Sequence, residues 1–261
     1  YSLCADEEAW SRPLERRSSR PARSTGILPG AVVCGKYRVT GVVRESGHRV
    51  SLRVQHEELR ETMLFTYVAR EALARPEVVG AFLRSARAAL RIRSEHVARI
   101  NDVGRLPSGA PYVVTEYLNG TPLDEVLRVR GALPPTEAVD IILQATVALA
   151  EVHSLGLVHG ALVPSSFELL RHSDGSGLVK VGGFGAAAMV EEFLQGDPRG
   201  NDPQELRTVL PYVAPERLRF PDQSSPAVDI YSLGAILYEL VTGTPAFRAS
   251  TPSALLAAIA A

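Results

Sequence analysis

Residues 181–185 of the chain read Val-Gly-Gly-Phe-Gly, residues 212–216 read Tyr-Val-Ala-Pro-Glu, and residues 229–234 read Asp-Ile-Tyr-Ser-Leu-Gly. Upstream of all three, residues 159–166 read His-Gly-Ala-Leu-Val-Pro-Ser-Ser. The third segment belongs to a run that begins near Pro226, stops at Gly243 and is apolar on nearly every side. The run therefore predicts a buried central helix.

The first half of the chain is typical of strands. Stretches rich in Val, Leu and Thr between Tyr37 and Val68 predict a small antiparallel sheet with a turn near Gly47. A helix is expected from Pro76, because apolar residues follow it at helical spacing. Two further strands are expected at 98–103 and 112–116.

The second half of the chain is mostly helical. A long helix is expected from Pro135 to about Gly156, and the apolar run that stops at Gly243 forms another. Strands first and helices afterwards predict an α+β fold.

The composition is that of an ordinary globular protein. The 261 residues are 46% hydrophobic with a net charge of −1, which allows one two-lobed domain or two small ones. No membrane span or signal peptide is expected, and the balanced charge gives no footprint for nucleic acid or a membrane surface. Cys4 and Cys34 are expected to be free thiols in a reducing cytoplasm.

The segments at 159–166, 181–185, 212–216 and 229–234 resemble, in order and spacing, the bacterial (Hanks-type) serine/threonine protein kinases. The resemblance runs from about Gly35 to the last residue. It implies a two-lobed fold, with a small lobe built on an antiparallel sheet at 36–118 and a mainly helical lobe at 119–261 from which the family's last helices are missing. Residues 1–35, rich in Ser, Pro and Arg, are expected to form a disordered basic tail.

The resemblance implies structural roles for four residues. His159 and Phe184 match an apolar stack between the lobes, and Asp229 matches an aspartate that braces the backbone of the catalytic loop. Glu216 matches an acid that pairs with an arginine in one of the missing helices. These packing residues are all retained.

The family's catalytic groups, in contrast, are replaced. Thr66 stands at the lysine that binds phosphates and Ser85 at the glutamate that pairs with it, so two small polar residues that fit each other replace an ion pair. Only Gly47 remains of the glycines that cover the phosphates.

The catalytic loop shows the same loss. Ala161 replaces the aspartate base, and Val163 replaces the lysine that stabilises the transferring phosphoryl group. Ser166 and Gly183 replace the two residues that hold magnesium, and neither offers a carboxylate. Gly160 removes the arginine that clasps a phosphorylated activation loop.

The pocket for adenine is altered as well. Leu64 replaces a small alanine above the base, and Glu168 places a carboxylate where an apolar residue forms the floor. Binding of ATP and magnesium is therefore not expected, and we expect no metal site. The vestigial pocket is expected at Gly47, Val50, Leu64, Glu116, Leu118 and Glu168.

These observations favour a pseudokinase, a kinase-like domain that binds a protein partner or regulates an attached module in cytoplasmic signalling. One alternative is an atypical serine/threonine kinase or a nucleotide-binding switch in which Arg49, Arg53 and Lys180 approach phosphates from new directions. A second is a decayed domain that only links its neighbours. His153 and His159 show no metal-ligand spacing and are interpreted as a surface and a core histidine.

Overall fold

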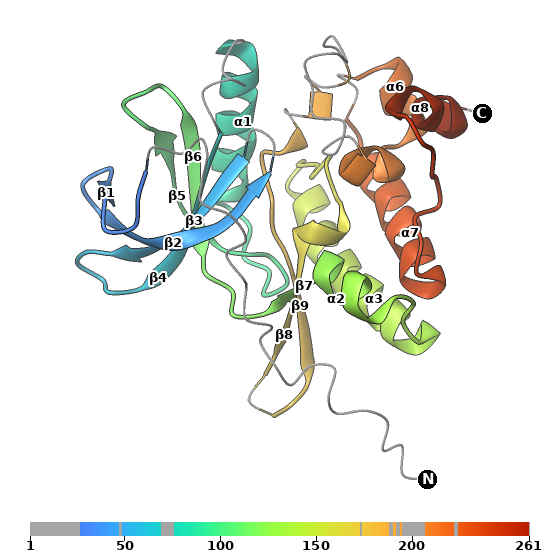
Figure 1. Ribbon diagram of the computed structural model, residues 1–261, viewed down its shortest axis with the longest axis horizontal. Coiled ribbons are helices and arrows are strands. Elements are labelled where there is room, and N and C mark those ends of the chain that lie inside the picture. The colour runs from blue at the N-terminus through green and yellow to red at the C-terminus, as the bar shows by residue number, and fades with distance from the viewer. Residues whose placement is uncertain are drawn as a thin grey trace.

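A sheet lobe and a mainly helical lobe make up the structure, a computed structural model in which residues 27–46, 49–68, 76–172, 174–187, 190–191, 194, 207–221 and 224–260 are described (Figure 1). This arrangement confirms the predicted α+β fold. The predicted turn at Gly47 and residues 1–26 lie outside the described residues.

The sheet lobe contains a six-stranded antiparallel sheet with strand order β1-β2-β3-β4-β6-β5. Its strands alternate buried and more exposed residues, as a sheet with two different faces requires. The strands are β1 (Val32–Val33), β2 (Tyr37–Ser46), β3 (Arg49–His56), β4 (Thr62–Val68), β5 (Ile100–Arg105) and β6 (Pro111–Glu116).

The two faces of this sheet pack against different cores. One face carries the outer core, which includes Leu52, Phe65 and Tyr112. The other face meets helix α1 (Pro76–Ala89), and α1 contributes Phe82 and Ala86 to the main core that continues into the helical lobe. The helix expected from Pro76 is thus confirmed, and it lies beside β5 and β6 in Figure 1.

The sheet lobe begins earlier in the chain than the predicted boundary between 35 and 36. Val32 and Val33 pair with Arg38 and Tyr37 of β2, so they belong to the sheet and not to a tail. The reason is burial, because Val33 and Cys34 pack against the outer core. The last residues of the predicted tail are therefore structured.

The helical lobe is built around two long helices, α3 (Pro135–Ser154) and α7 (Pro226–Thr242). A three-stranded sheet of order β7-β8-β9 lies beside them (Figure 1). Its strands are β7 (Thr121–Pro122), β8 (Phe167–Arg171) and β9 (Gly177–Val181), and the remaining helical elements are α2 (Leu123–Arg130), η2 (Pro164–Ser166), η4 (Leu210–Tyr212), α6 (Pro215–Arg219) and α8 (Pro252–Ala260).

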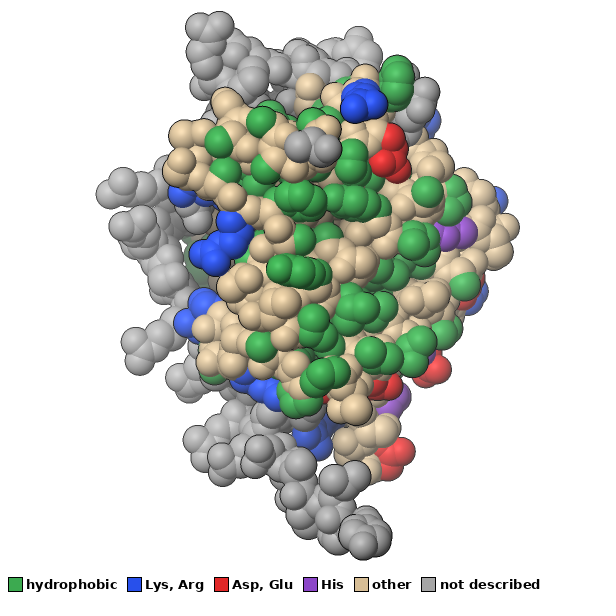
Figure 2. Space-filling model, turned by 90° about the vertical axis from the view of Figure 1, so that its right-hand side faces the viewer, with side chains coloured by type: hydrophobic (Ala, Val, Ile, Leu, Met, Phe, Trp, Pro, Cys, Tyr) green, Lys and Arg blue, Asp and Glu red, His purple; other side chains and the backbone are tan. Residues whose placement is uncertain are grey.

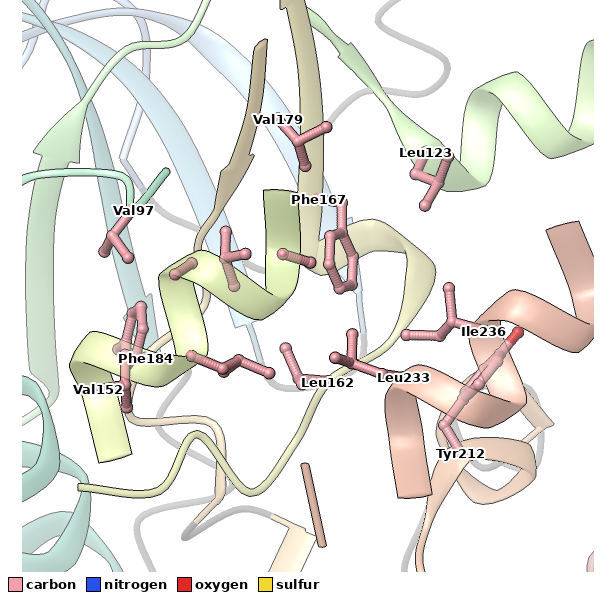
Figure 3. Packing of buried hydrophobic residues seen from close by; sticks show 14 of the residues in the cluster. Val97, Leu123, Val152, Leu162, Phe167, Val179, Phe184, Tyr212, Leu233 and Ile236 are labelled. Atoms are coloured by element: carbon pink, nitrogen blue, oxygen red, sulfur yellow. The ribbon is translucent and has the colours of Figure 1, made fainter. Parts of the chain in front are cut away.

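Buried side chains from several of these elements meet in the main core. Figure 3 shows Phe167 and Val179 of the β8–β9 hairpin above Leu162, with Leu233 and Ile236 of α7 beside it. All five side chains are buried. The loop at 159–166 is therefore anchored between the hairpin and α7.

Helix α7 ends where predicted but is not buried on all sides. Gly243 follows it with φ +74°, and a Cβ there would lie 2.8 Å from Ala132 N, so glycine is required. Ile236 is fully buried, whereas Ile230 is 53% exposed. The apolar pattern was misleading because one side of α7 contributes to an exposed apolar face (Figure 2). The large exposed apolar residues of α3 and α7 are Val139, Leu143, Val147, Ile230, Tyr238 and Val241.

The two sides of α7 should differ in their contribution to stability. Ile236→Ala should lower the free energy of unfolding by about 3 kcal/mol, because it leaves a cavity in the main core. Ile230→Ala on the exposed side is the matched control and should cost less than about 1 kcal/mol. Urea denaturation followed by circular dichroism measures both, and equal losses would contradict the two-sided assignment.

Candidate functional site

The loop at 159–166 is held by one carboxylate at the start of α7. Asp229 is fully buried, and its Oδ2 accepts a hydrogen bond from His159 N (2.9 Å) while its Oδ1 accepts one from Gly160 N (2.7 Å). His153 Nε2 lies 2.8 Å from Asp229 Oδ2. The structure thus places Asp229 where the resemblance implies, and it draws His153, interpreted as a surface residue, into the same network.

His159 connects this loop to the segment at 181–185. Its Nε2 donates to Gly182 O (2.9 Å), its Nδ1 accepts from Ala161 N (3.4 Å), and its ring meets the Phe184 ring edge-on at a centroid distance of 4.7 Å. Burial lowers the pKa of His159, although Asp229 and the Gly182 carbonyl act in the opposite direction. A neutral ring with one donor and one acceptor nitrogen fits these contacts.

The positions of the lost magnesium ligands lie next to each other. A Cβ placed on Gly183 would lie 3.8 Å from Ser166 Oγ and 3.9 Å from His159 Nε2. Ser166 Oγ is already engaged, because it accepts a hydrogen bond from Val163 N (3.2 Å). Magnesium is held by carboxylates and other oxygen ligands, whereas these residues supply one hydroxyl and no carboxylate. The residues at this place therefore do not fit the ion.

The other catalytic positions hold groups that take part in packing. Ala161 is half-buried and offers only a methyl group, and Val163 packs against the main core. Within the described residues, no cluster of three His, Cys, Asp or Glu side chains could hold a metal ion.

Thr66 has a partner other than the one expected. Its Oγ1 lies 2.9 Å from Ser51 Oγ on the neighbouring strand, in a hydrogen bond that either hydroxyl can donate. The register of β3 and β4 places Ser51 directly opposite Thr66. Ser85 is half-buried on α1, and the hydroxyl that completes the pair comes from the sheet instead of the helix.

Val50 does not belong to the vestigial pocket. The register pairs Arg49, Ser51 and Arg53 of β3 with Val68, Thr66 and Leu64 of β4. Directly opposed residues on antiparallel strands share a face, so Ser51 shares the face of Thr66 and Leu64. Val50 points to the opposite face and is buried in the outer core. A slip of one residue in the alignment caused the error, because successive side chains alternate.

Glu116, Leu118 and Glu168 of the expected pocket lie at or beside residues 117–120, the segment that joins β6 of the sheet lobe to β7 of the helical lobe. Glu168 packs beneath this segment, since a Cβ on Gly120 would lie 2.8 Å from Glu168 Cγ. Glu116 Oε1 accepts hydrogen bonds from Lys180 Nζ (2.7 Å) and Arg99 N (2.9 Å). Leu118, like Leu64, is half-buried. The side chain of Glu116 is therefore occupied by a salt bridge.

Four cationic side chains of the sheet lobe and of β9 differ in what they contact. Arg44 of β2 forms an ion pair with Asp124 of α2, which ties the sheet lobe to the helical lobe. Arg49 lies close enough to His159 to contribute to the lowering of its pKa. Arg53 is directed to Thr40, and Lys180 is bound to Glu116. Of the three cations proposed to approach phosphates, only Arg49 has a position that suits the role.

Sequence reasoning missed Arg217, which is 2% exposed. Its Nη1 donates to Gly160 O (2.8 Å) and its Nη2 donates to Pro221 O (2.9 Å). Gly160 has φ +69°, and a Cβ there would lie 2.9 Å from Ala187 Cβ and 3.3 Å from Arg217 Nη1. Arg217 thus occupies the space beside Gly160. No sequence signal points to it, because both of its partners are backbone carbonyls.

Glu216, the neighbouring residue, is exposed. The resemblance implies that it pairs with an arginine in a later helix of the family, and that pairing stays a prediction. The buried charge of this short helix is Arg217 instead. Burial lowers the pKa of Arg217, while Glu191 and Asp229 favour its charged form.

Removal of the Arg217 guanidinium should destabilise the loop. Arg217→Ala leaves two carbonyls without donors and should cost about 3 kcal/mol of unfolding free energy. The matched control is Arg219→Ala on the same helix, an exposed residue that should cost less than about 0.5 kcal/mol. Denaturant unfolding compares the two, and a small effect at Arg217 would show that its buried contacts contribute little.

Comparisons with known proteins agree with this geometry. The profile of the protein kinase domain matches residues 67–260. Serine/threonine-protein kinase pkn3 of Myxococcus xanthus is 27% identical over 222 residues, which is 85% of this chain and 40% of the relative. PknB of Mycobacterium tuberculosis is 31% identical over 192 residues, 71% of this chain and 29% of the relative. The chain thus spans less than half the length of these curated relatives.

A solved structure shares the fold. The crystal structure of a cysteine-to-alanine mutant of the Mycobacterium tuberculosis PknI kinase domain has a TM-score of 0.67 and 20% sequence identity, and the match covers 90% of this chain and 86% of that one. This likeness shows the fold, and the matched profile identifies the family. The chain belongs to the protein kinase domain family, among the bacterial (Hanks-type) serine/threonine kinases.

Proposed function

We propose that this kinase domain is a pseudokinase, which transfers no phosphate and acts as a protein-binding or regulatory module in signalling. One observation carries the proposal. The places of the catalytic base and of the main metal ligand are occupied by Ala161 and Gly183, and the side-chain oxygen that lies beside Gly183 in the described part of the chain is the hydroxyl of Ser166, which accepts a hydrogen bond from Val163 N.

Phosphoryl transfer depends on groups that this site lacks. It needs phosphates held in place, metal charge between them, and an acceptor hydroxyl beside a base. Each of these losses commonly costs ~10²-fold or more in rate, and their effects are not independent. Thr66 and Ser85 stand in place of the lysine and the glutamate that form an ion pair in the family, so this ion pair is missing in addition to the catalytic base and the metal ligands.

The retained network supports a role that depends on shape. A fully buried carboxylate is costly unless donors surround it, and Asp229 keeps three of them. The stack of His159 on Phe184 is also kept. These contacts fix the loop and the segment at 181–185, which a binding surface requires and a decayed linker does not.

Nucleotide binding is not part of the proposal. Glu168 stands where the resemblance implies the apolar floor of the adenine pocket, and a carboxylate there is a poor surface for an apolar base. Leu64 shares the face of Thr66 and narrows the same space. The ion pair between Arg44 and Asp124 also links the lobes.

A nucleotide-binding switch is the second candidate, and one observation favours it. Arg49 lies on the face of the sheet that carries Thr66 and is close enough to His159 to affect its pKa. A guanidinium in this place could contact a phosphate without magnesium. A binding measurement separates the two candidates.

No phosphoryl transfer is expected from the purified chain. With Mg-ATP or Mn-ATP, neither autophosphorylation nor phosphorylation of a generic substrate should exceed the level of a blank preparation, since base and metal ligands are absent. An active bacterial serine/threonine kinase domain prepared in the same way is the positive control. Phosphate incorporation that copurifies with the chain and disappears when Arg49 is changed to Glu would overturn the pseudokinase proposal.

Nucleotide should leave the melting temperature of the chain unchanged. A ligand at 100 times its dissociation constant would add about 2.7 kcal/mol of stability, which a thermal-shift titration detects easily. ATP, ADP and AMP are tested with magnesium and with EDTA, and the Arg49→Ala variant is the matched control. A rise in melting temperature that persists in EDTA and is lost in Arg49→Ala would support the nucleotide-binding switch and not the pseudokinase.

A further inference from the structure

Four arginines lie close together at the end of α1 and in the turn that follows it. Arg84, Arg87, Arg91 and Arg93, here called the arginine surface, are all exposed and have no acidic residue between them in the sequence. The whole chain carries a net charge of −1, so this concentration of positive charge is local. We propose that the arginine surface binds an acidic segment of a partner protein.

The arginines on α1 share one side of the helix. Arg84 and Arg87 are three residues apart, a spacing that places their side chains next to each other on the helix. Phe82 and Ala86 are buried on the opposite side. Arg91 and Arg93 follow in the turn after Ala89, where α1 ends. The face of α1 that does not contact the sheet is therefore lined by guanidinium groups.

Gly80 leaves space on the helix surface for the side chain of Arg84. A Cβ on Gly80 would lie 3.1 Å from Arg84 Nη1, so the Arg84 side chain lies back along the helix over the glycine. Glycine inside a helix costs roughly 0.5–1 kcal/mol relative to alanine. A side chain at this position would push the guanidinium away from the helix surface.

The arginine surface lacks the internal partners that other arginines have. Among the described residues, none of the four arginines forms an ion pair. The one hydrogen bond that their side chains make to a described residue runs from Arg91 Nη2 to Leu155 O (3.4 Å). Elsewhere carboxylates neutralise Arg38, Arg44, Arg128 and Arg130. Exposed guanidinium groups that no described carboxylate neutralises are suited to an external anionic partner.

The surface reaches from one lobe to the other. Arg91 contacts Leu155 at the end of α3, and Arg93 N donates to Glu151 Oε1 of the same helix (2.6 Å). On its inner side α1 is in close contact with the segment at 181–185, since a Cβ on Gly185 would lie 3.1 Å from Phe82 Cε2. A partner bound here would thus contact both lobes and the helix that packs on the degenerate site.

Spacing and charge favour a protein segment over nucleic acid or a membrane. Guanidinium groups bind carboxylates through two parallel hydrogen bonds, and carboxylates on one face of a helix or strand repeat every ~5–7 Å, close to the spacing of Arg84 and Arg87. The chain has no extended positive field to attract nucleic acid. In the described part of 76–105, no large apolar side chain is exposed that could enter a bilayer.

A labelled peptide tests the proposal directly. Fluorescence anisotropy is measured with a fluorescein-labelled peptide of alternating Glu and Ala, and the same peptide with Gln in place of Glu is the uncharged control. The Glu peptide should bind at low salt and weaken as salt screens the charges, whereas the Gln peptide should not bind. No binding of the Glu peptide at low salt would overturn the proposal.

Matched variants locate the binding. The double variant Arg84→Glu, Arg87→Glu should lose affinity by about tenfold or more, because attraction becomes repulsion at two contacts. The control Arg219→Glu, Arg248→Glu has the same change in net charge on exposed arginines of the helical lobe and should lose less than about twofold. Unchanged circular dichroism and thermal unfolding confirm that each variant is folded.

The remaining outcomes are also decisive. Equal losses in the two double variants would show unspecific attraction and overturn the proposal. Tighter binding of a single-stranded oligonucleotide or of anionic vesicles, lost in Arg84→Glu, Arg87→Glu, would assign the surface to that partner instead. The inference rests on the proposed role as a binding module, but the assay contains no nucleotide. A failure of the peptide to bind therefore does not bear on whether the chain transfers phosphate. Phosphoryl transfer, in turn, would not by itself contradict peptide binding at the arginine surface.

Discussion

The buried carboxylate of Asp229 is the constraint on which the centre of the molecule depends. It accepts hydrogen bonds from two consecutive backbone amides, at His159 and Gly160, and it lies within hydrogen-bond distance of the His153 ring. A buried carboxylate without these donors would be strongly unfavourable, so the loop has to approach α7 in this one way. The loop position then fixes where His159 meets Phe184 and where the segment at 181–185 runs.

Neighbouring side chains pack closely against two glycines in the described part of the site. Arg217 occupies the space beside Gly160, and the Phe82 ring approaches Gly185 so closely that a Cβ there would lie 3.1 Å from it. Ser166 turns its hydroxyl to the backbone of its own loop. Close packing explains why such a site can lose its chemistry and keep its shape, since neighbouring atoms replace the contacts that are lost.

The candidate site and the outer side of α1 differ in the charges that they offer. At the candidate site, Ala161, Ser166 and Gly183 supply no carboxylate, and the ion pair between Arg44 and Asp124 links the two lobes. At the end of α1 and in the turn after it, the arginine surface offers positive charge that no described carboxylate neutralises, and α1 contacts the segment at 181–185 through Phe82. A regulatory domain of this kind would act through what binds α1 and not through what enters the candidate site.

The sequence by itself determined the family, the two-lobed α+β fold and the side chains that stand at residues 161 and 183, because motif order, strand and helix periodicity and side-chain identity are local properties. A carboxylate missing at Ala161 or Gly183 cannot be restored by folding unless another residue brings one. Only the tertiary structure decided that Val50 faces the outer core, that Lys180 is bound to Glu116, and that one side of α7 is exposed. It also decided the role of Arg217, whose partner Gly160 lies 57 residues away. These features depend on strand register and on contacts with backbone carbonyls, and neither leaves a pattern in the order of side chains.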